Sequence, residues 1–385
     1  MPDHASILIE RARALVPLLE EHAAEAERLR KPHDAVMAAI EEAEIFKLMV
    51  PRERGGFELD LDTFLEVGLT LSEGDASMAW VTTFLIEHCW LFCHFPPSTQ
   101  DEIFGDKGYA LAPGVIAPTG VAKRVEGGFR LDGRWQWGTG ITHSTWVMVG
   151  ARVESDNGEL DIRFLTMPIE DVTVDDTWYV DGMRATGSND IVIDDLFVPE
   201  ARSANLMEIA SGNGPASKFY SGPLYKTPMI PILALAAAMP AVGQARAAIN
   251  RFREAMSGRI MYGTMDKQAD RPAAQIRLAR AELEVLGAEL LLRDAVREVM
   301  ELRENATPQD RARWVAMYAL AVDQSKRVLQ SIAEVSGAKA HFETHPLQRA
   351  VRDVNTLACH VVFDLDSRLE LMGRAMLGHE LKGLL

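Results

Sequence analysis

The sequence predicts an α+β protein built from three consecutive parts: helical, then β, then helical again. Apolar residues recur at three- and four-residue intervals over residues 7–30 and 34–48, as on the buried face of a helix. Between residues 109 and 199, short apolar runs alternate with glycine-rich turns, a texture typical of strands. Helical periodicity returns after residue 228 and persists to the end of the chain.

The length of the chain limits its possible domain organisations, and its net charge limits its possible partners. Because 385 residues exceed one ordinary hydrophobic core, we expect an N-terminal helical domain (1–108), a central β domain (109–210) and a C-terminal helical bundle (211–385). The net charge of -16 argues against nucleic acid or an anionic membrane as a partner. The N-terminus lacks the basic start and apolar run of a secretion signal, so we expect a cytoplasmic protein.

Turn signals separate the expected elements of the first two parts. Residues 51–56 form a turn-rich break, after which residues 61–71 and 76–95 resume helical character. Gly127 and Gly128 suit a tight hairpin turn, because glycine accepts a positive φ. Residues 191–199 are interpreted as the last strand, leaving the sheet.

The third part predicts long helices. The apolar stretch 229–242 is interrupted by two prolines and is shorter than a membrane span, so we interpret it as a buried helix. A second helix is expected to begin near Pro272. Its apolar residues follow a seven, three, four spacing: Ile276, Leu283, Leu286 and Leu290. Helices of about 25 to 30 residues carry more apolar surface than one small bundle needs, which favours association between subunits.

The cysteines predict neither disulfides nor a metal site. Three occur, Cys89, Cys93 and Cys359, too few and too scattered for a disulfide framework. His88 and His94 crowd beside the first two, which raises the alternative of a metal site. On a helix, however, the two histidines would point to different faces, so we expect no metal.

Five segments spread over nearly the whole chain carry a family resemblance. Residues 51–56 read PRERGG, residues 72–80 SEGDASMAW and residues 182–190 GMRATGSND. Residues 259–263 read RIMYG and residues 349–353 RAVRD. Together with the order of the parts, these segments resemble the acyl-CoA dehydrogenase superfamily, and the third, a G-x-R-x-T-x-S string, is the most specific. The resemblance implies that superfamily's fold, with a barrel-like β domain and a C-terminal four-helix bundle.

Residues 133–140, GRWQWGTG, are similar to the strand and turn that face the flavin in this superfamily. The resemblance implies that Trp135 or Trp137 packs against the flavin ring, while the Thr139 hydroxyl and backbone N–H groups near Gly140 bond its edge. The alternative is a hairpin whose tryptophans fill the core of the sheet.

Two further segments are implied to contact the flavin. The hydroxyl-rich loop suits a phosphate or a ring edge, and the RIMYG segment is similar to one that binds the flavin diphosphate across a subunit boundary. The alternatives are a plain polar loop and an exposed, unpaired arginine. The residues concerned are Arg184, Thr186 and Ser188 in the loop, and Arg259, Tyr262 and Gln275 near the boundary.

One residue distinguishes two activities within the superfamily. The dehydrogenases often carry a catalytic glutamate shortly after the R-D pair, but residues 354–361 contain no carboxylate. His360 stands there instead, as in the related flavin monooxygenases, and an imidazole titrates near neutral pH and can exchange a proton with a phenol. His88 and Thr139 are the other catalytic candidates that the resemblance implies. The alternative is that either histidine is a core or surface residue.

The chain thus resembles the oxygenase component of a group D two-component flavin monooxygenase, similar to the p-hydroxyphenylacetate hydroxylases. No G-x-G-x-x-G opens a βαβ unit, so reduced flavin, FADH2 or FMNH2, is expected from a separate flavin reductase. With O2 it would form a C4a-hydroperoxide that hydroxylates a small phenolic substrate in a homotetramer. The alternatives are an acyl-CoA dehydrogenase, a nitrogen or sulfur monooxygenase of the same fold, and a non-catalytic scaffold.

Overall fold

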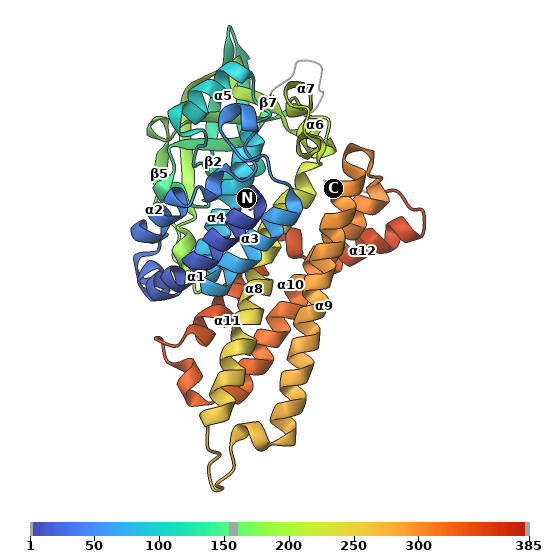
Figure 1. Ribbon diagram of the computed structural model, residues 1–385. Coiled ribbons are helices and arrows are strands. Elements are labelled where there is room, and N and C mark those ends of the chain that lie inside the picture. The colour runs from blue at the N-terminus through green and yellow to red at the C-terminus, as the bar shows by residue number, and fades with distance from the viewer. Residues whose placement is uncertain (1–2, 154–160, 382–385) are drawn as a thin grey trace.

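The computed structural model describes residues 3–153 and 161–381. Figure 1 shows the strands and the shorter helices gathered at one end, with three long helices extending to the other. The predicted order of helical, β and helical parts is confirmed.

Helices make up the whole N-terminal part. The longest begins at the N-terminus, and a fully buried one, α4, follows an Asp75 N-cap whose side chain accepts the N–H of Met78. Because all 17 residues of α4 are buried, it packs against neighbours on every side. The helices are α1 (His4–Leu29), α2 (Asp34–Glu42), α3 (Leu61–Gly74), α4 (Ala76–Phe92) and α5 (Pro97–Phe104).

The central part is one seven-stranded sheet with strand order β5-β6-β2-β1-β3-β4-β7. All neighbours are antiparallel except β1 and β3, which run parallel. Gly127, at a φ of 79°, makes the predicted hairpin turn between β1 and β2. The strands are β1 (Gly114–Val125), β2 (Gly128–Gly138), β3 (Trp146–Val153), β4 (Asp161–Pro168), β5 (Thr173–Asp175), β6 (Asn189–Pro199) and β7 (Ser203–Asn205).

One strand prediction was wrong. The strand predicted over residues 191–199 does not leave the sheet, because β6 pairs with β5 on one side and β2 on the other. The short β7 follows it and closes the opposite edge against β4. Three residues give too weak an alternation for sequence patterns to detect such a strand.

Three long helices dominate the third part. Helix α8 is apolar and long enough to cross a membrane, but 94% of its apolar window is buried inside the protein, so the prediction of a buried helix is confirmed. Pro272 opens α9, as predicted. The helices are α6 (Leu206–Ser211), α7 (Ala216–Phe219), α8 (Met229–Gly258), α9 (Pro272–Leu302), α10 (Pro308–Ser336), α11 (Pro346–Leu357) and α12 (Leu365–Met376).

Helix α8 joins the parts. It packs against α3 and α4 on one side and against α9 and α10 on the other. Helix α4 also contacts α11 and the turn over residues 184–186 that precedes β6. Side chains of α4 therefore lie where the β domain, the N-terminal helices and the C-terminal helices meet.

Candidate active site

A row of aromatic rings on α4 forms one wall of the candidate site. Trp80, Phe84 and His88 follow each other at intervals of four residues, which places them on one face of the helix. Ring centroids are 4.7 Å apart between Trp80 and Phe84, and 5.7 Å apart between Phe84 and His88. The ring of His360, in the turn after α11, meets the edge of Trp80 at 5.7 Å. Two of the predicted catalytic histidines thus flank one aromatic wall.

Thr139 reaches the same wall from the β domain. Its Oγ1 accepts a hydrogen bond from Trp80 Nε1 at 3.4 Å and lies 3.1 Å from Ser188 Oγ. Thr186 Oγ1 lies a further 2.7 Å from Ser188 Oγ, so the three hydroxyls form a continuous chain. Gly140, in the left-handed region at a φ of 72°, donates its N–H to the Thr186 carbonyl. The structure therefore brings together the predicted residues Thr139, Gly140, Thr186 and Ser188.

His360 is a hydrogen-bond donor toward the wall. Its Nδ1 accepts the N–H of Val362 at 3.3 Å, which assigns the proton of the neutral ring to Nε2. Burial, together with the charge of Arg368, lowers the pKa of His360 to about 4. The ring is therefore neutral near pH 7, and a protonated ring would place an N–H against the N–H of Val362.

His88 has the opposite tautomer. Its Nδ1 lies 2.7 Å from the Ala112 carbonyl oxygen, which only accepts, so Nδ1 carries the proton and Nε2 has the lone pair. Burial lowers the pKa of His88 to about 4, so this ring also stays neutral. Nε2 lies 3.3 Å from Oε2 of Glu87 and has no hydrogen-bond partner among the described residues.

Sequence reasoning missed Glu87. Its carboxyl is completely buried, neither oxygen is hydrogen-bonded within the described residues, and burial raises its pKa well above the ordinary value. Burial therefore favours the neutral acid beside the lone pair of His88. A signal existed, because Glu87 is the only charged residue within the otherwise apolar α4.

The loop before β6 presents a donor with no protein partner. Arg184 Nε is buried and unpaired within the part of the chain that the structure describes, although its neighbours Thr186 and Ser188 are bonded to each other. An unpaired buried donor beside two hydroxyls fits the polar edge or a phosphate of a flavin, because such a group would satisfy it. The residues of this loop therefore suit the implied cofactor.

The two tryptophans of β2 differ in their positions. Trp135 has no exposed surface: its ring fills the sheet core, and its Nε1 donates to the Gly150 carbonyl at 2.6 Å. This position corrects the prediction that Trp135 packs on a flavin, since no face of the ring is open. Trp137 is 58% exposed, has a φ of 85° at an irregularity of β2, and meets Trp178 edge-on.

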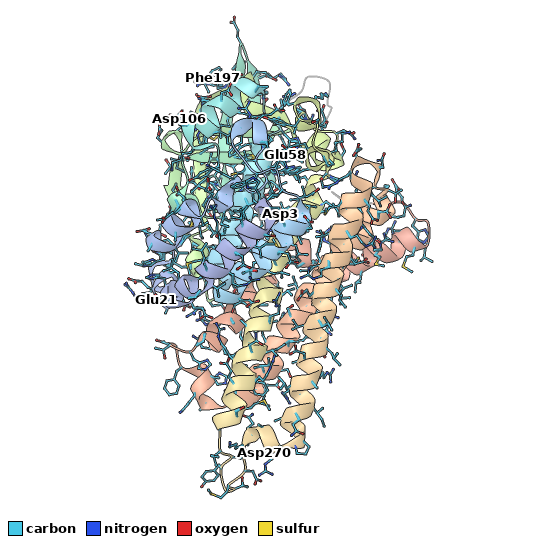
Figure 2. All side chains as sticks on the ribbon, in the orientation of Figure 1. Asp3, Glu21, Glu58, Asp106, Phe197 and Asp270 are labelled. Atoms are coloured by element: carbon cyan, nitrogen blue, oxygen red, sulfur yellow. The ribbon has the colours of Figure 1, made fainter. Side chains whose placement is uncertain are left out.

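The predicted diphosphate residues lie elsewhere in the chain. Figure 2 shows Asp270 at the tip of the long helices, remote from Asp106 and Phe197 at the β end. Tyr262, in the same α8–α9 connection, is fully exposed, and Arg259 donates to the Val335 carbonyl at 2.7 Å. A single chain therefore places the α8–α9 connection at the opposite end of the long helices from the strands (Figure 1).

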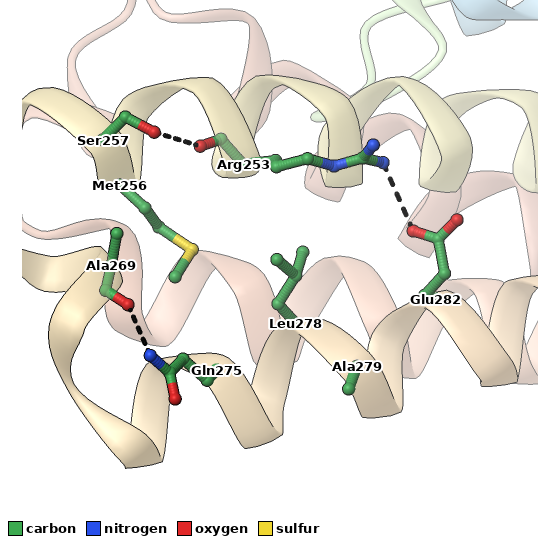
Figure 3. A pocket seen from close by; sticks show the side chains of 8 residues that line it. All are labelled: Arg253, Met256, Ser257, Ala269, Gln275, Leu278, Ala279 and Glu282. Carbon is green, nitrogen blue, oxygen red and sulfur yellow. Dashed lines mark hydrogen bonds and ion pairs between the residues drawn. The ribbon is translucent and has the colours of Figure 1, made fainter.

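Gln275 lines a pocket of about 410 Å³ between α8 and α9. Its side chain donates to the Ala269 carbonyl, and Arg253 of α8 reaches Glu282 of α9 across the pocket, as Figure 3 shows. The floor is apolar, with Met256 and Leu278. This pocket belongs to the tip region and not to the aromatic wall.

The histidines and cysteines in and just after α4 bond to different backbone groups. Cys89 Sγ donates to the Ala110 carbonyl, and His94 Nδ1 accepts the N–H of Ala216. A different cluster, His22, Glu25 and His33, has ligand atoms within 4.8 Å of one another. Its two imidazole rings are stacked at 3.9 Å and nearly parallel, so their in-plane lone pairs do not converge on one point.

The comparisons with known proteins agree with this site. Residues 235–365 match the family described as acyl-CoA dehydrogenase, C-terminal domain. The chain is 34% identical to a pigment production hydroxylase from Rhodococcus sp. (strain ATCC 21145), over 95% of both chains. It is 29% identical to the oxygenase component of the FADH(2)-dependent resorcinol hydroxylase from Rhizobium sp. (strain MTP-10005), over 98% of this chain and 95% of the relative.

The structure is similar to that of XiaF from Streptomyces sp., which was solved in complex with FADH2 and glycerol. The TM-score is 0.92 and the identity 31%, with 99% of this chain and 98% of that chain covered. The predicted fold and the predicted family are both confirmed. With its aromatic wall, its chain of hydroxyls and these relatives, the chain belongs to the flavin-dependent oxygenase components of two-component monooxygenases, which have the acyl-CoA dehydrogenase fold.

Proposed function

We propose that this enzyme hydroxylates a small phenolic substrate, using O2 and reduced FAD that a separate flavin reductase delivers. The observation that carries the proposal is the meeting of Thr139, Trp80 and His360, from three parts of the chain, within hydrogen-bond or ring contact. The relatives named above support FADH2 over FMNH2, since one is FADH(2)-dependent and another was solved with FADH2. Relatives named for resorcinol and p-hydroxyphenylacetate support a phenolic substrate.

When bound, the reduced flavin reacts with O2 and supplies the oxygen atom that enters the substrate. Thr139, with Ser188 and Thr186 behind it, would bond and orient the polar edge of the flavin ring. Arg184 would use its unpaired Nε–H on the same molecule. Trp80 and Phe84 would exclude water from the reacting groups.

His360 would bind the substrate oxygen. Because Nδ1 accepts the Val362 N–H, the Nε2–H group is the one free to donate, and a phenol or phenolate oxygen is a matching acceptor. A base role would require the ring to gain a second N–H and lose the Val362 contact. We therefore favour His360 as the donor that holds the reacting ring, with His88 at the far end of the wall.

The proposal includes a homotetramer in the cytoplasm. In it, Arg259, Tyr262 and Gln275 of one subunit would bind the flavin diphosphate in the site of a neighbour, because the α8–α9 connection lies at the opposite end of the long helices from the strands of its own chain (Figure 1). The predicted apolar row of α9 supports association, since its four members are 50–69% exposed: Ile276, Leu283, Leu286 and Leu290. The net charge of -16 and the burial of α8 support the expectation of no nucleic-acid or membrane partner.

Replacing His360 tests the proposal. His360→Ala should retain FAD binding but lose product formation by about 100-fold, a typical effect of removing a group that handles a substrate proton or oxygen. His360→Gln, whose amide still donates, should recover part of the activity. Product is measured by chromatography with FADH2 from an added reductase, and FAD binding by fluorescence titration.

Three results would contradict the proposal or part of it. Unchanged product formation by His360→Ala would remove this residue from the site. Rapid bleaching of bound FAD by acyl-CoA substrates would instead indicate the dehydrogenase reaction. Oxygenated sulfur or nitrogen products, with phenols untouched, would retain the flavin site but reject the phenolic substrate.

A further inference from the structure

Met183 belongs to the loop over residues 182–188, which precedes β6 and is proposed to contact the flavin. Several other groups are hydrogen-bonded to its backbone. Met183 has a φ of 56°, in the left-handed region that side chains other than glycine rarely adopt. Its N–H donates to Asp353 Oδ1 at 2.6 Å. Its carbonyl accepts from Trp178 Nε1 at 2.9 Å and from Thr186 Oγ1 at 3.0 Å. An unfavourable backbone conformation persists only where surrounding contacts hold it, as these do.

Asp353 comes from a different part of the chain than the loop it holds. It lies on α11, 170 residues away from Met183 in sequence, and only 3% of it is exposed. The neighbouring Arg352 donates to the Asp181 carbonyl at 2.6 Å, just before the loop. A Cβ atom at Gly182 would lie 2.2 Å from the Arg352 carbonyl oxygen, so loop and helix are in direct backbone contact.

The charged groups around Asp353 come from three helices. Asp75, the N-cap of α4, faces it and is 2% exposed. Arg349 of α11 lies between them, with its Nε 3.5 Å from Asp75 Oδ2. Glu27 of α1 adds a third carboxyl, which is paired with Arg352 at 2.5 Å. Two buried carboxyls therefore share one guanidinium, next to an ion pair.

We propose that Asp353 is a positioning residue for the flavin: by accepting the Met183 N–H, it holds residues 182–188 in the conformation that presents Arg184, Thr186 and Ser188. This inference rests on the proposed function, in which that loop contacts the flavin. Arg184 directly follows the held residue, and Thr186 is itself bonded to the Met183 carbonyl. Releasing Met183 therefore displaces the flavin-contacting groups together.

The proton on this carboxyl sets how much negative charge is buried beneath the loop. Burial and the charge of Asp75 raise the pKa of Asp353 to about 8. Below that pH the neutral acid still accepts the Met183 N–H through Oδ1. Above it the buried cluster gains one negative charge beside Asp75 and Glu27, and this repulsion favours displacement of Asp353 from the loop. Flavin affinity should therefore fall as the pH rises through about 8.

Two substitutions separate the acceptor from the charge. Asp353→Asn retains an acceptor oxygen and never ionises, so it should bind FAD about as tightly as the unaltered enzyme near pH 7 and show no alkaline loss. Asp353→Ala leaves the buried Met183 N–H without a partner, and FAD should bind about tenfold more weakly. Asp310→Ala, which removes a cap of α10, is the control and should bind FAD normally.

The measurement is the dissociation constant of oxidised FAD, and of FADH2 under anaerobic conditions, by fluorescence and absorbance titration from pH 6.5 to 9.5. Circular dichroism checks folding. Should Asp353→Ala not fold, the alkaline loss in the unaltered enzyme and its absence in Asp353→Asn decide. Wild-type affinity in Asp353→Ala, or an unchanged alkaline loss in Asp353→Asn, would overturn the inference. Failure of the unaltered enzyme to bind FAD would reject the proposed function itself.

Discussion

At the scale of single residues, the pair of Glu87 and His88 has an unusual proton arrangement. Burial raises the pKa of the acid and lowers the pKa of the imidazole to about 4, so it favours the neutral form of both groups. One group therefore offers an O–H and the other a lone pair, 3.3 Å apart. Such a pair titrates as a unit, so a change in either residue is expected to alter the proton affinity of the other.

Glu87→Gln tests this arrangement. The amide is close to the carboxyl in size and carries no charge at any pH. The raised pKa of Glu87 means that its stabilising contribution is present in acid and is lost as the pH rises. We therefore expect Glu87→Gln to become more stable than the unaltered protein as the pH rises from 6 to 9, measured as the free energy of unfolding in urea.

Glu87→Ala provides the contrast. It removes a fully buried side chain and leaves a cavity, which should lower the free energy of unfolding by about 1–3 kcal/mol near neutral pH. Equal pH profiles for the unaltered protein and Glu87→Gln would show that Glu87 does not hold a proton in this range.

Motifs located the hydroxyls and His360, but not the environment of each side chain. Thr139, Thr186 and Ser188 stood in strings whose composition already suited a polar ring edge. Trp135 and Trp137 stood in the same segment. Strand alternation did not show which of the two faces the core, because the pairing of β2 is irregular between Trp135 and Gly138. Glu87 belongs to no motif, since its role depends on burial, which only packing decides.

At the scale of elements, the turn after β2 is fitted closely to α4. A Cβ atom at Gly140 would lie 2.9 Å from Val81 Cγ1, and Gly140 also has a positive φ of 72°. The glycine therefore serves two purposes: the backbone conformation and the close approach to the helix. Thr139, which precedes it, reaches Trp80 because of that approach.

Gly140→Ala should therefore lower the stability of the folded protein by more than the cost of a positive φ alone. A Cβ in the left-handed region costs about 1–2 kcal/mol, and the contact with Val81 adds to this. Gly127→Ala is the matched control, because its φ is 79° but the nearest atom, Phe197 Cζ, is 3.9 Å away. Thermal unfolding should show a larger loss for Gly140→Ala, and FAD binding should weaken only there. Equal losses would mean that the turn does not depend on α4.

Helix starts were predicted well where periodicity is strong. Helices α4, α8 and α9 begin where apolar spacing and Pro272 predicted, but α8 continues to Gly258, well past the predicted stretch 229–242. Strands β5 and β7, each three residues long, were not predicted. Short edge strands take their conformation from the neighbour they pair with, and that neighbour is distant in sequence. The domain boundary at residue 210 stays a prediction, and α6 spans it.

At the scale of the whole molecule, association through α9 is the first expectation. Leu283→Glu combined with Leu286→Glu places two charges in the exposed apolar row and should convert the proposed tetramer to smaller species, because a charge buried at an interface is costly. Val125→Glu, at the tip of the β1–β2 hairpin, is the control. Analytical ultracentrifugation measures the result. An intact tetramer in the double variant would locate the interface elsewhere.

Stability should also fall in acid. Burial lowers the pKa of His88 and His360 to about 4 and that of His94 to about 3. A lowered pKa in the folded state means that the stabilising contribution is present above about pH 6.5 and is lost as the pH falls through 4. The raised pKa values of Glu87 and Asp353 act in the opposite direction, so the comparison uses the double variant Glu87→Gln, Asp353→Asn. Its free energy of unfolding should decline from pH 6.5 to 4.5. A flat profile there would indicate that these rings are hydrated.

Neither periodicity nor motif indicated how far apart the two predicted flavin segments lie. Residues 133–140 and 259–275 are placed by the sheet and by the 30-residue α8, and the direction of α8 depends on its packing against α3, α4 and α10. Such tertiary directions are set by many weak contacts, which a single sequence does not display.

Arg259 and Tyr262 are proposed to complete the site around Thr139 of a neighbouring subunit. The turnover rate should therefore depend on the protein concentration. In the proposed assembly a monomer does not contain a complete cofactor site. Dilution to concentrations at which the tetramer dissociates should therefore abolish activity even while every chain remains folded. Mixing two inactive mutants, one altered at Thr139 and the other at Arg259, should regenerate some working sites by pairing intact halves. The cell would then tune this activity through expression level as well as through reductant supply.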